Sequence, residues 1–188
     1  MSKTTIPAGG LASDTVTTAK IADDAVTAAK AGLSSGKLLQ VQHNTTSGSN
    51  TSVTSDSFSA TEVTDQITPS ASSSKILVIC NLSCSQYENS GTHNKFRAAI
   101  YRSINGASYA RVYAGQANSY GGMGGFGSGT EISSSWPVTL TFTDSPNTTS
   151  AVDYKVYLAL NVASEGGNNV TTGASDMERG VTLIEIGA

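Results

Sequence analysis

Alternation of apolar and polar residues is the clearest pattern after residue 36, and it predicts β-strands. The stretch Ser74–Cys84 is apolar at both alternating sets of positions, which is typical of strands buried between two layers. We therefore predict a central strand here, against which the other elements pack. Residues 95–104 and 107–113 alternate on either side of Asn105-Gly106, and this dipeptide accepts the positive φ angles of a hairpin turn.

Six further stretches between turn-forming residues are predicted to be strands, and the period of two is clearest in the first, fourth and fifth of them. They are Lys37–His43, Thr51–Phe58, Ala60–Thr68, Trp136–Thr143, Val152–Val162 and Gly180–Ile186. Eight or nine strands, with no helix predicted after Gly36, indicate an all-β fold: an antiparallel two-sheet sandwich that is jelly-roll-like. An immunoglobulin-like sandwich is the alternative, and it usually brings a Cys–Trp–Cys spacing that is absent here.

The first 36 residues follow a different rule, a ten-residue repeat. LASDTVTTAK is followed directly by IADDAVTAAK, and the large apolar residues recur every five positions at Ile6, Leu11, Val16, Ile21 and Val26. A period of five places these residues on one face of neither a helix nor a strand, so a lone chain cannot bury them together. Several copies around an axis could, and we predict that these five residues form an oligomer seam. A flexible linker rich in Ala and Thr is the alternative.

The repeat ends in the sequence AGLSSG at 31–36, which we interpret as a domain boundary. Residues 1–36 are predicted to be an extended N-terminal arm, and residues 37–188 a β-sandwich head domain. The arm contains Asp23-Asp24, a candidate cation site, but Lys20 and Lys30 are close by in the repeat and favour a solvated charged surface.

Composition narrows the function classes. Charged residues make up 13% of the chain, against about 25% in typical domains, and Ser, Thr, Asn and Gly take their place. The net charge is −3 and the eleven Lys and Arg are scattered, so no basic stripe for nucleic acid is expected. No apolar run reaches the roughly 18 residues of a membrane span, and the first ten residues do not resemble a signal peptide. We expect synthesis in a cytoplasm without secretion.

Candidate chemistry is sparse, and we predict no enzyme activity, no catalytic residues, no cofactor and no metal. The two histidines, His43 and His93, fall on a strand and in a loop. Cys80 and Cys84 are four apart on one strand, so their Cα atoms would lie roughly 13 Å apart, too far for a disulfide, and we interpret them as small buried apolar groups. Residues 122–127 match a dinucleotide-binding pattern without the strand–turn–helix context that it requires.

The glycine-rich segment 115–129 carries Tyr120, Met123 and Phe126 on a backbone with few other side chains. Apolar groups presented in this way suit contact with a partner. Two interpretations remain open: the partner is a cell-surface glycan or another subunit, or the three residues pack on a neighbour at a trimer axis or cover the edge of a sheet.

The repeats of the type IADDAVTAAK, followed by SASSSKILVICNLS and a final VTLIEIGA, resemble the fibre and fibre-like virion appendage proteins of tailed bacteriophages. The group includes head fibres, capsid decorations and short tail fibres. The resemblance implies a homotrimer whose residues 1–36 bind another virion protein, in the capsid or the tail. It also implies a head domain displayed on the particle exterior, where it contacts the host.

Two other function classes remain as alternatives. The first is a lectin-like, glycan-binding tail-fibre protein. The second is a carbohydrate-active enzyme, which would need paired carboxylates about 5–10 Å apart, and the chain contains few acidic residues.

Overall fold

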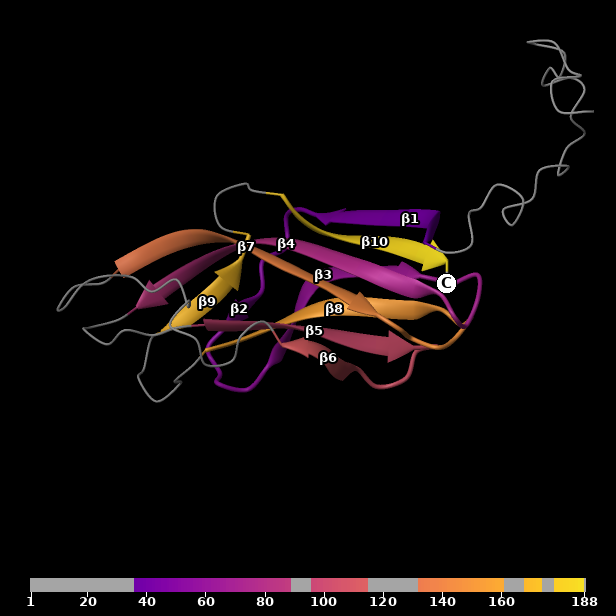
Figure 1. Ribbon diagram of the computed structural model, residues 1–188. Coiled ribbons are helices and arrows are strands. Elements are labelled where there is room, and N and C mark those ends of the chain that lie inside the picture. Colours follow the sequence, from indigo (N-terminus) through magenta and orange to yellow (C-terminus); the bar gives the residue numbers. More distant parts are fainter. Residues whose placement is uncertain (1–35, 89–95, 115–131, 161–167, 174–177, 188) are drawn as a thin grey trace, which may run out of the picture. The chain divides into compact units, whose positions relative to one another are not determined.

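The computed structural model describes residues 36–88, 96–114, 132–160, 168–173 and 178–187. These residues form ten β-strands in two antiparallel sheets (Figure 1). The strands are β1 (Lys37–Thr46), β2 (Ser52–Val53), β3 (Ser59–Ile67), β4 (Lys75–Glu88), β5 (Phe96–Ile104), β6 (Ala110–Ala114), β7 (Ile132–Asp144), β8 (Val152–Leu160), β9 (Asn169–Thr172) and β10 (Arg179–Gly187). No helix among the described residues is long and apolar enough to cross a membrane.

The strand order is that of a jelly roll. In the first sheet, sheet A, β1 pairs with β10, β10 with β4, and β4 with β7; β9 follows β10 along the same edge of β4, and β2 pairs with β9. In the second sheet, sheet B, the order is β3-β8-β5-β6. Among the eight long strands, every connection except the β5–β6 hairpin crosses from one sheet to the other. The predicted fold class, an antiparallel two-sheet sandwich of the jelly-roll type, is confirmed.

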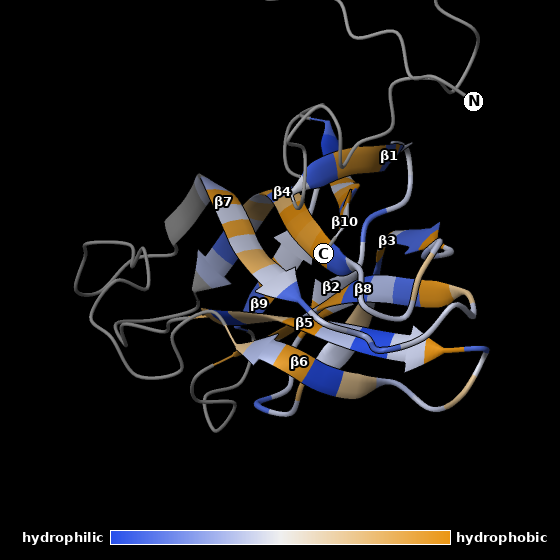
Figure 2. Ribbon diagram, turned by 45° about the vertical axis from the view of Figure 1, so that its right-hand side comes forward, coloured by the Kyte–Doolittle hydropathy of each residue, from blue (hydrophilic) through white to orange (hydrophobic). Residues whose placement is uncertain are grey.

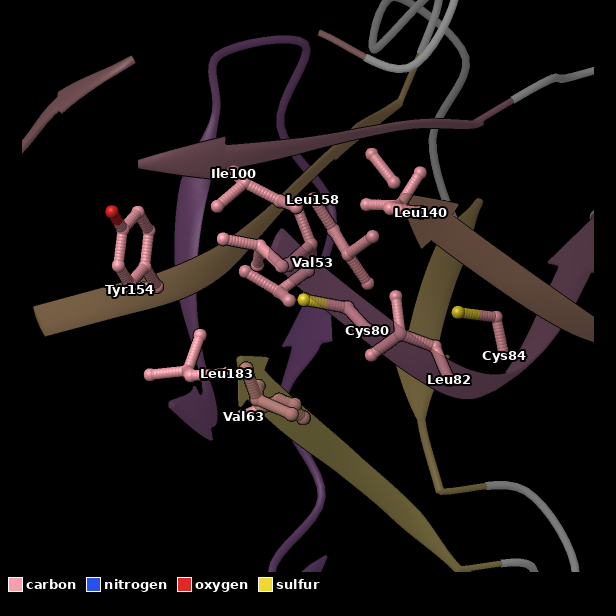
Figure 3. Close-up of a cluster of buried hydrophobic side chains, with 14 of the residues drawn as sticks. Val53, Val63, Cys80, Leu82, Cys84, Ile100, Leu140, Tyr154, Leu158 and Leu183 are labelled. Carbon is pink, nitrogen blue, oxygen red and sulfur yellow. The ribbon is translucent and has the colours of Figure 1, made fainter. Parts of the chain in front are cut away.

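The core lies between the inner faces of the two sheets (Figure 3). Strand β4 is central, as predicted, because β7 lies on one of its edges and β10 and β9 on the other. Its inner positions, from Ile76 to Cys84, are buried together with the inner positions of β8 and β5. The prediction that both faces of β4 are buried is wrong for the described residues. Leu77 and Ile79 on the outer face are half-buried, because the described strands form two layers and none of them lies over the outer face of sheet A.

Both cysteines are free and buried in this core, as predicted. Burial raises the pKa of the Cys80 and Cys84 thiols to about 12, so the reactive thiolate is scarce at neutral pH. We expect a thiol reagent such as Ellman's reagent to modify neither residue in the native protein and both in urea. Modification of the native protein before it unfolds would contradict this burial.

The local predictions are confirmed at some points and corrected at others. Asn105 and Gly106 have φ angles of 51° and 74° and form the predicted turn, but the return strand begins at Ala110 rather than Ala107. The predicted strand over 51–58 is reduced to the two residues of β2. Residues 164–176 were predicted to be a polar loop, but they contain strand β9. The composition of Asn169–Thr172 does not indicate a strand, and these residues gain their order from pairing with β4.

The sandwich has two distinct ends. At one end β1 begins beside the last residue of β10, since Lys37 pairs with Gly187. At the opposite end, which we call the distal end, β4, β6 and β8 finish and β5, β7 and β9 start, as the pairs Glu88–Ile132 and Phe96–Leu160 show. The connections β4–β5, β6–β7 and β8–β9 therefore all leave from the distal end (Figure 1).

Candidate functional site

The partner-contact residues predicted from the sequence, Tyr120, Met123 and Phe126, lie outside the described residues. The predicted oligomer seam lies outside them as well, and it comprises Ile6, Leu11, Val16, Ile21 and Val26. Both stay predictions. The site that the structure does assemble is on the outer face of sheet B.

Aromatic and cationic side chains gather on that outer face, which we call the aromatic face. Its members come from the segment before β3 and from β5, β6 and β8. They are Phe58, Arg97, Tyr101, Tyr109, Arg111, Lys155 and Tyr157. Strand geometry explains the arrangement, because successive side chains point to opposite faces: Ile100 and Val156 point into the core, so Tyr101 and Tyr157 point out.

The four rings form a continuous row. Tyr101 and Tyr157 are stacked with ring centroids 3.9 Å apart and planes inclined by 24°. Phe58 lies at one side of the pair, 6.0 Å from Tyr101, and Tyr109 at the other, 6.1 Å from Tyr157. The two separations of about 6 Å fall in the 4.5–7 Å range of favourable aromatic contacts, and the stacked central pair is closer than that range. The row therefore holds its own geometry without a ligand.

Three cations flank the row. The guanidinium carbons of Arg97 and Arg111 lie 5.2 and 5.7 Å from the centroid of Phe58, and the ammonium of Lys155 lies 5.1 Å from that of Tyr109, all within cation–π range. Arg97 is held in place further, since its Nη2 donates to the carbonyl oxygens of Asp56 and Leu160. Arg111 is exposed, so part of its hydrogen-bonding fork faces water.

Two small residues lie beneath the larger ones. Ala99 and Ala159 occupy outward positions, where they pair with Tyr157 and Arg97, yet both are fully buried. Neighbouring side chains of the outer face must therefore cover them. Methyl groups at these positions let the rings lie close to the sheet.

The phenol groups of Tyr109 and Tyr157 stay protonated at neutral pH. Burial raises the pKa of Tyr157, and the neighbouring Tyr109 and Tyr101 raise it further. Burial also raises the pKa of Tyr109, with an added contribution from Asp153. The face thus offers aromatic rings, neutral hydroxyl groups that both donate and accept hydrogen bonds, and cations that can bind a carboxylate or sulfate.

Sequence reasoning found this face only in part. It placed Tyr109, Arg111 and Tyr113 on one face of a strand, but a register shift between Ile100 and Tyr101 places Tyr113 opposite the inward-facing Ile100. Tyr113 therefore stacks on Phe142 of sheet A, with centroids 5.0 Å apart. The period-two pattern of β5 and β8 was the available signal for Tyr101 and Tyr157. The pairing of these two strands was not visible in it.

The described carboxylates of the interior have structural partners. Glu62 forms an ion pair with Arg179 at 2.8 Å and accepts hydrogen bonds from Thr172 and Thr51. Burial raises the pKa of Glu62, but those two hydrogen bonds, a backbone hydrogen bond and the charge of Arg179 together outweigh it, so the pKa lies below its ordinary value. These partners hold Glu62 as a charged structural group.

Asp144 makes a bidentate ion pair with Arg102, at 2.9 and 2.7 Å. It also accepts a 2.7 Å hydrogen bond from the hydroxyl of the buried Tyr154. Burial and this hydrogen bond raise the pKa of the Tyr154 phenol, which therefore remains a donor. The group joins the end of β7 to β5 and β8.

Glu185 is fully buried at the end of β10. It accepts hydrogen bonds from the backbone N–H and hydroxyl of Ser70, both at 2.7 Å, and from Gln40 Nε2 at 2.6 Å. Burial raises its pKa, but hydrogen bonds including these lower it to about 2, against an ordinary value of 4.5. Glu185 thereby ties the β3–β4 connection to the end of sheet A.

This carboxylate predicts a pH dependence of stability. Because the folded-state pKa of Glu185 is depressed, its contribution is present above pH 4.5 and is lost as the pH falls toward 2. Denaturant titrations across this window should show the free energy of unfolding falling, with a slope from this one group of at most about 1.4 kcal/mol per pH unit. Glu185→Gln should flatten the curve in that window. An unchanged slope in the variant would contradict the assignment.

Of the two histidines, only His43 lies among the described residues. His43 shares a 2.8 Å hydrogen bond with the Thr182 hydroxyl on the outer face of sheet A, and His93 lies outside the described residues. Within the described part of the chain, no three His, Cys, Asp or Glu side chains come together as a metal site.

No family model and no curated protein matches the chain. Among solved structures it is similar to a chain of the infectious bursal disease virus Gx strain, with 13% sequence identity over 80% of this chain and 33% of that chain, at a TM-score of 0.37. It is similar to a chain of the T13 IBDV viral particle, with 9% identity over 80% of this chain and 36% of that chain, at a TM-score of 0.35. It is also similar to the infectious bursal disease virus VP2 subviral particle, with 15% identity over 80% of this chain and 34% of that chain, at a TM-score of 0.35. The neighbours are viral particle proteins. The chain spans about a third of the length of each, and likeness at these TM-scores carries no argument about function.

Proposed function

We propose that the protein is a non-enzymatic structural component of a phage virion. It is a trimeric fibre or decoration appendage, attached to the capsid or tail by residues 1–36, and its jelly-roll domain on the particle exterior contacts a host-surface glycan. The observation that carries the host-contact role is the aromatic face. The repeat with its five-residue spacing supports the trimer and the attachment.

The chemistry of the aromatic face suits a sugar. A pyranose ring has an apolar C–H surface that stacks on aromatic side chains, and hydroxyl groups at its rim that hydrogen-bond to Tyr and Arg. The four rings offer several aromatic contacts side by side, since neighbouring centroids are 3.9 to 6.1 Å apart. The three cations favour sugars that carry carboxylate or sulfate groups.

A carbohydrate-active enzyme is the weaker alternative. Such an enzyme needs two carboxylates that flank the scissile bond. Glu62, Asp144 and Glu185 are instead engaged by Arg179, by Arg102 and by Ser70 with Gln40. A binding role makes no such demand, because stacking and hydrogen bonding require no reacting group.

Binding to an array of immobilised neutral and acidic oligosaccharides tests the host-contact role. We expect Tyr157→Ala to weaken binding about tenfold or more, as for other aromatic residues central to an interface. Thr141→Ala, an exposed position on the outer face of sheet A, is the control and should bind like the wild type. Wild-type protein that binds no oligosaccharide, or equal binding by Tyr157→Ala, would overturn the role.

Deletion of residues 1–36 tests the attachment separately. In a virion appendage this deletion should remove the protein from purified particles, as detected by antibody labelling in electron micrographs, and leave the aromatic face intact. A freely acting lectin would keep its function without the arm. Full-length protein that never copurifies with particles would refute the virion role.

A further inference from the structure

The outer face of sheet A carries an aliphatic patch. In the register of the sheet, Val41 of β1 lies beside Ile184 of β10, which lies beside Leu77 of β4, so three strands contribute one row of apolar side chains. The next rows add Leu38 beside Ile186, and Ile79 beside Thr182. Figure 2 shows the hydrophobic colour along parts of β1, β4 and β10. We call this set the sheet A patch: Leu38, Val41, Leu77, Ile79, Ile184 and Ile186.

Strand β1 makes the patch unusual. The exposed large hydrophobic residues in the described part of the chain are Leu38 (64% exposed), Leu39 (43%) and Val41 (50%). All three belong to this one ten-residue edge strand. Scattered apolar residues on a surface are ordinary, but a contiguous apolar group points to an interaction.

The patch and its surroundings have almost no charge. On β7 the neighbouring outward residues are Thr139, Thr141 and Thr143. Among the outward residues of β4 and β10 that pair with each other, the charged one is Lys75, which lies opposite Ile186. The described carboxylates of sheet A, Asp144 and Glu185, lie at inward positions. Soluble proteins usually protect an exposed edge strand with charge or proline. The sequence KLLQVQHNTT of β1 has one lysine and no proline.

An uncharged apolar face is suited to the axis of a symmetric assembly, where the same patch of each copy meets the others. The copies meet there without repulsion between like charges, and the surface offers no charge pattern for a different partner to recognise. The connection to the arm favours the same occupant. Lys37, the first residue of β1, follows the predicted seam residue Val26 by only eleven positions, at most about 40 Å of chain. If the arms assemble around an axis, the start of each β1 is tethered within about 40 Å of the seam residue Val26.

We propose that the sheet A patch packs against a second copy of this chain, so that β1 and its neighbours form the head-domain interface of the trimer. This inference rests on the proposed function for the trimer itself and adds the surface that the head domains use. It also explains why the sequence of β4 is apolar on both faces: the inner face is covered within one chain, and the outer face is covered by assembly.

Cysteine accessibility in the full-length protein tests the interface. Val41→Cys places a thiol in the patch, and Ala110→Cys places one at an exposed position on β6 of sheet B. Both substitutions are small, and the native thiols are buried. The probe is a maleimide-linked polyethylene glycol, followed by gel shift, while sedimentation velocity measures the mass. We expect a trimer in which Val41→Cys reacts roughly tenfold or more slowly than Ala110→Cys, with equal rates in urea.

The outcomes separate the two proposals. A trimer in which both positions react at the same rate overturns the sheet A interface and leaves the trimeric appendage standing. A monomer in which both react equally overturns the trimer and the interface together. Protection of Val41→Cys in a monomer would mean that the chain's own residues 1–36 cover the patch. That result would also overturn the proposal that a second copy covers it.

Discussion

Replacement of Arg179 by Met is expected to lower the free energy of unfolding by about 3–5 kcal/mol, the usual cost of leaving a buried charge without its partner. Arg179 is only 3% exposed. It pairs with Glu62, and its Nη2 also donates to the carbonyl of Ser49 and to Asn50 Oδ1. The substitution keeps most of the volume of the side chain, so the loss is electrostatic. Urea denaturation followed by circular dichroism would measure it.

The double variant Glu62→Met/Arg179→Met is the matched control. It removes both charges, and pairs replaced by apolar groups of similar volume are often neutral or stabilising. The double variant should therefore be more stable than Arg179→Met alone. With Glu62→Met measured as well, the coupling energy of the pair is the cost of the double variant minus the costs of the two single variants. A double variant that is less stable than Arg179→Met would show that the site depends on its hydrogen bonds to Thr51 and Thr172 more than on charge balance.

Leu158→Ala is expected to cost about 3–5 kcal/mol, by loss of buried methyl groups and creation of a cavity. Leu158 is fully buried on β8, in the cluster that contains Cys80 and Ile100 (Figure 3). It lies on the second strand of sheet B, with β3 and β5 on its two sides, so the surroundings have little room to collapse. Thermal and urea denaturation should both report the loss.

Leu158→Met is the control for the cavity, since it nearly conserves volume and should cost less than about 1.5 kcal/mol. A cost for Leu158→Ala below that of Leu158→Met would contradict the tight packing of this core. Both variants leave the aromatic face and the sheet A patch unchanged, so oligosaccharide binding and sedimentation provide a check that the native surface persists.

Sequence periodicity was sufficient to predict most of the fold. Strands with inward β-branched residues, such as 152–160, were found within a few residues of their ends because burial of one face imposes a period of two. The turn at Asn105-Gly106 was predictable from local backbone preference alone. These features depend on residues that are close together in the sequence, so they can be predicted from one sequence alone.

The features that were missed depend on partners far apart in the sequence. Arg179 lies between the predicted polar loop, residues 164–176, and the predicted strand that begins at Gly180. Its partner Glu62 is more than a hundred positions away in the sequence. Strand β9 has an Asn- and Thr-rich sequence that differs little from a loop. The position of Tyr113 changed face through a bulge of one residue, which shifts every later side chain. For the same reason the aromatic face was seen only as separate tyrosines.

The two ends of the sandwich differ in which strand ends they bring together. The chain enters the sandwich at the end where Lys37 pairs with Gly187, and the polypeptide of the three connections β4–β5, β6–β7 and β8–β9 departs from the other pole. Because the length of the sandwich separates the two ends, a substitution at a distal strand end, such as residue 96 or 160, is expected to leave the register of β1 with β10 unchanged.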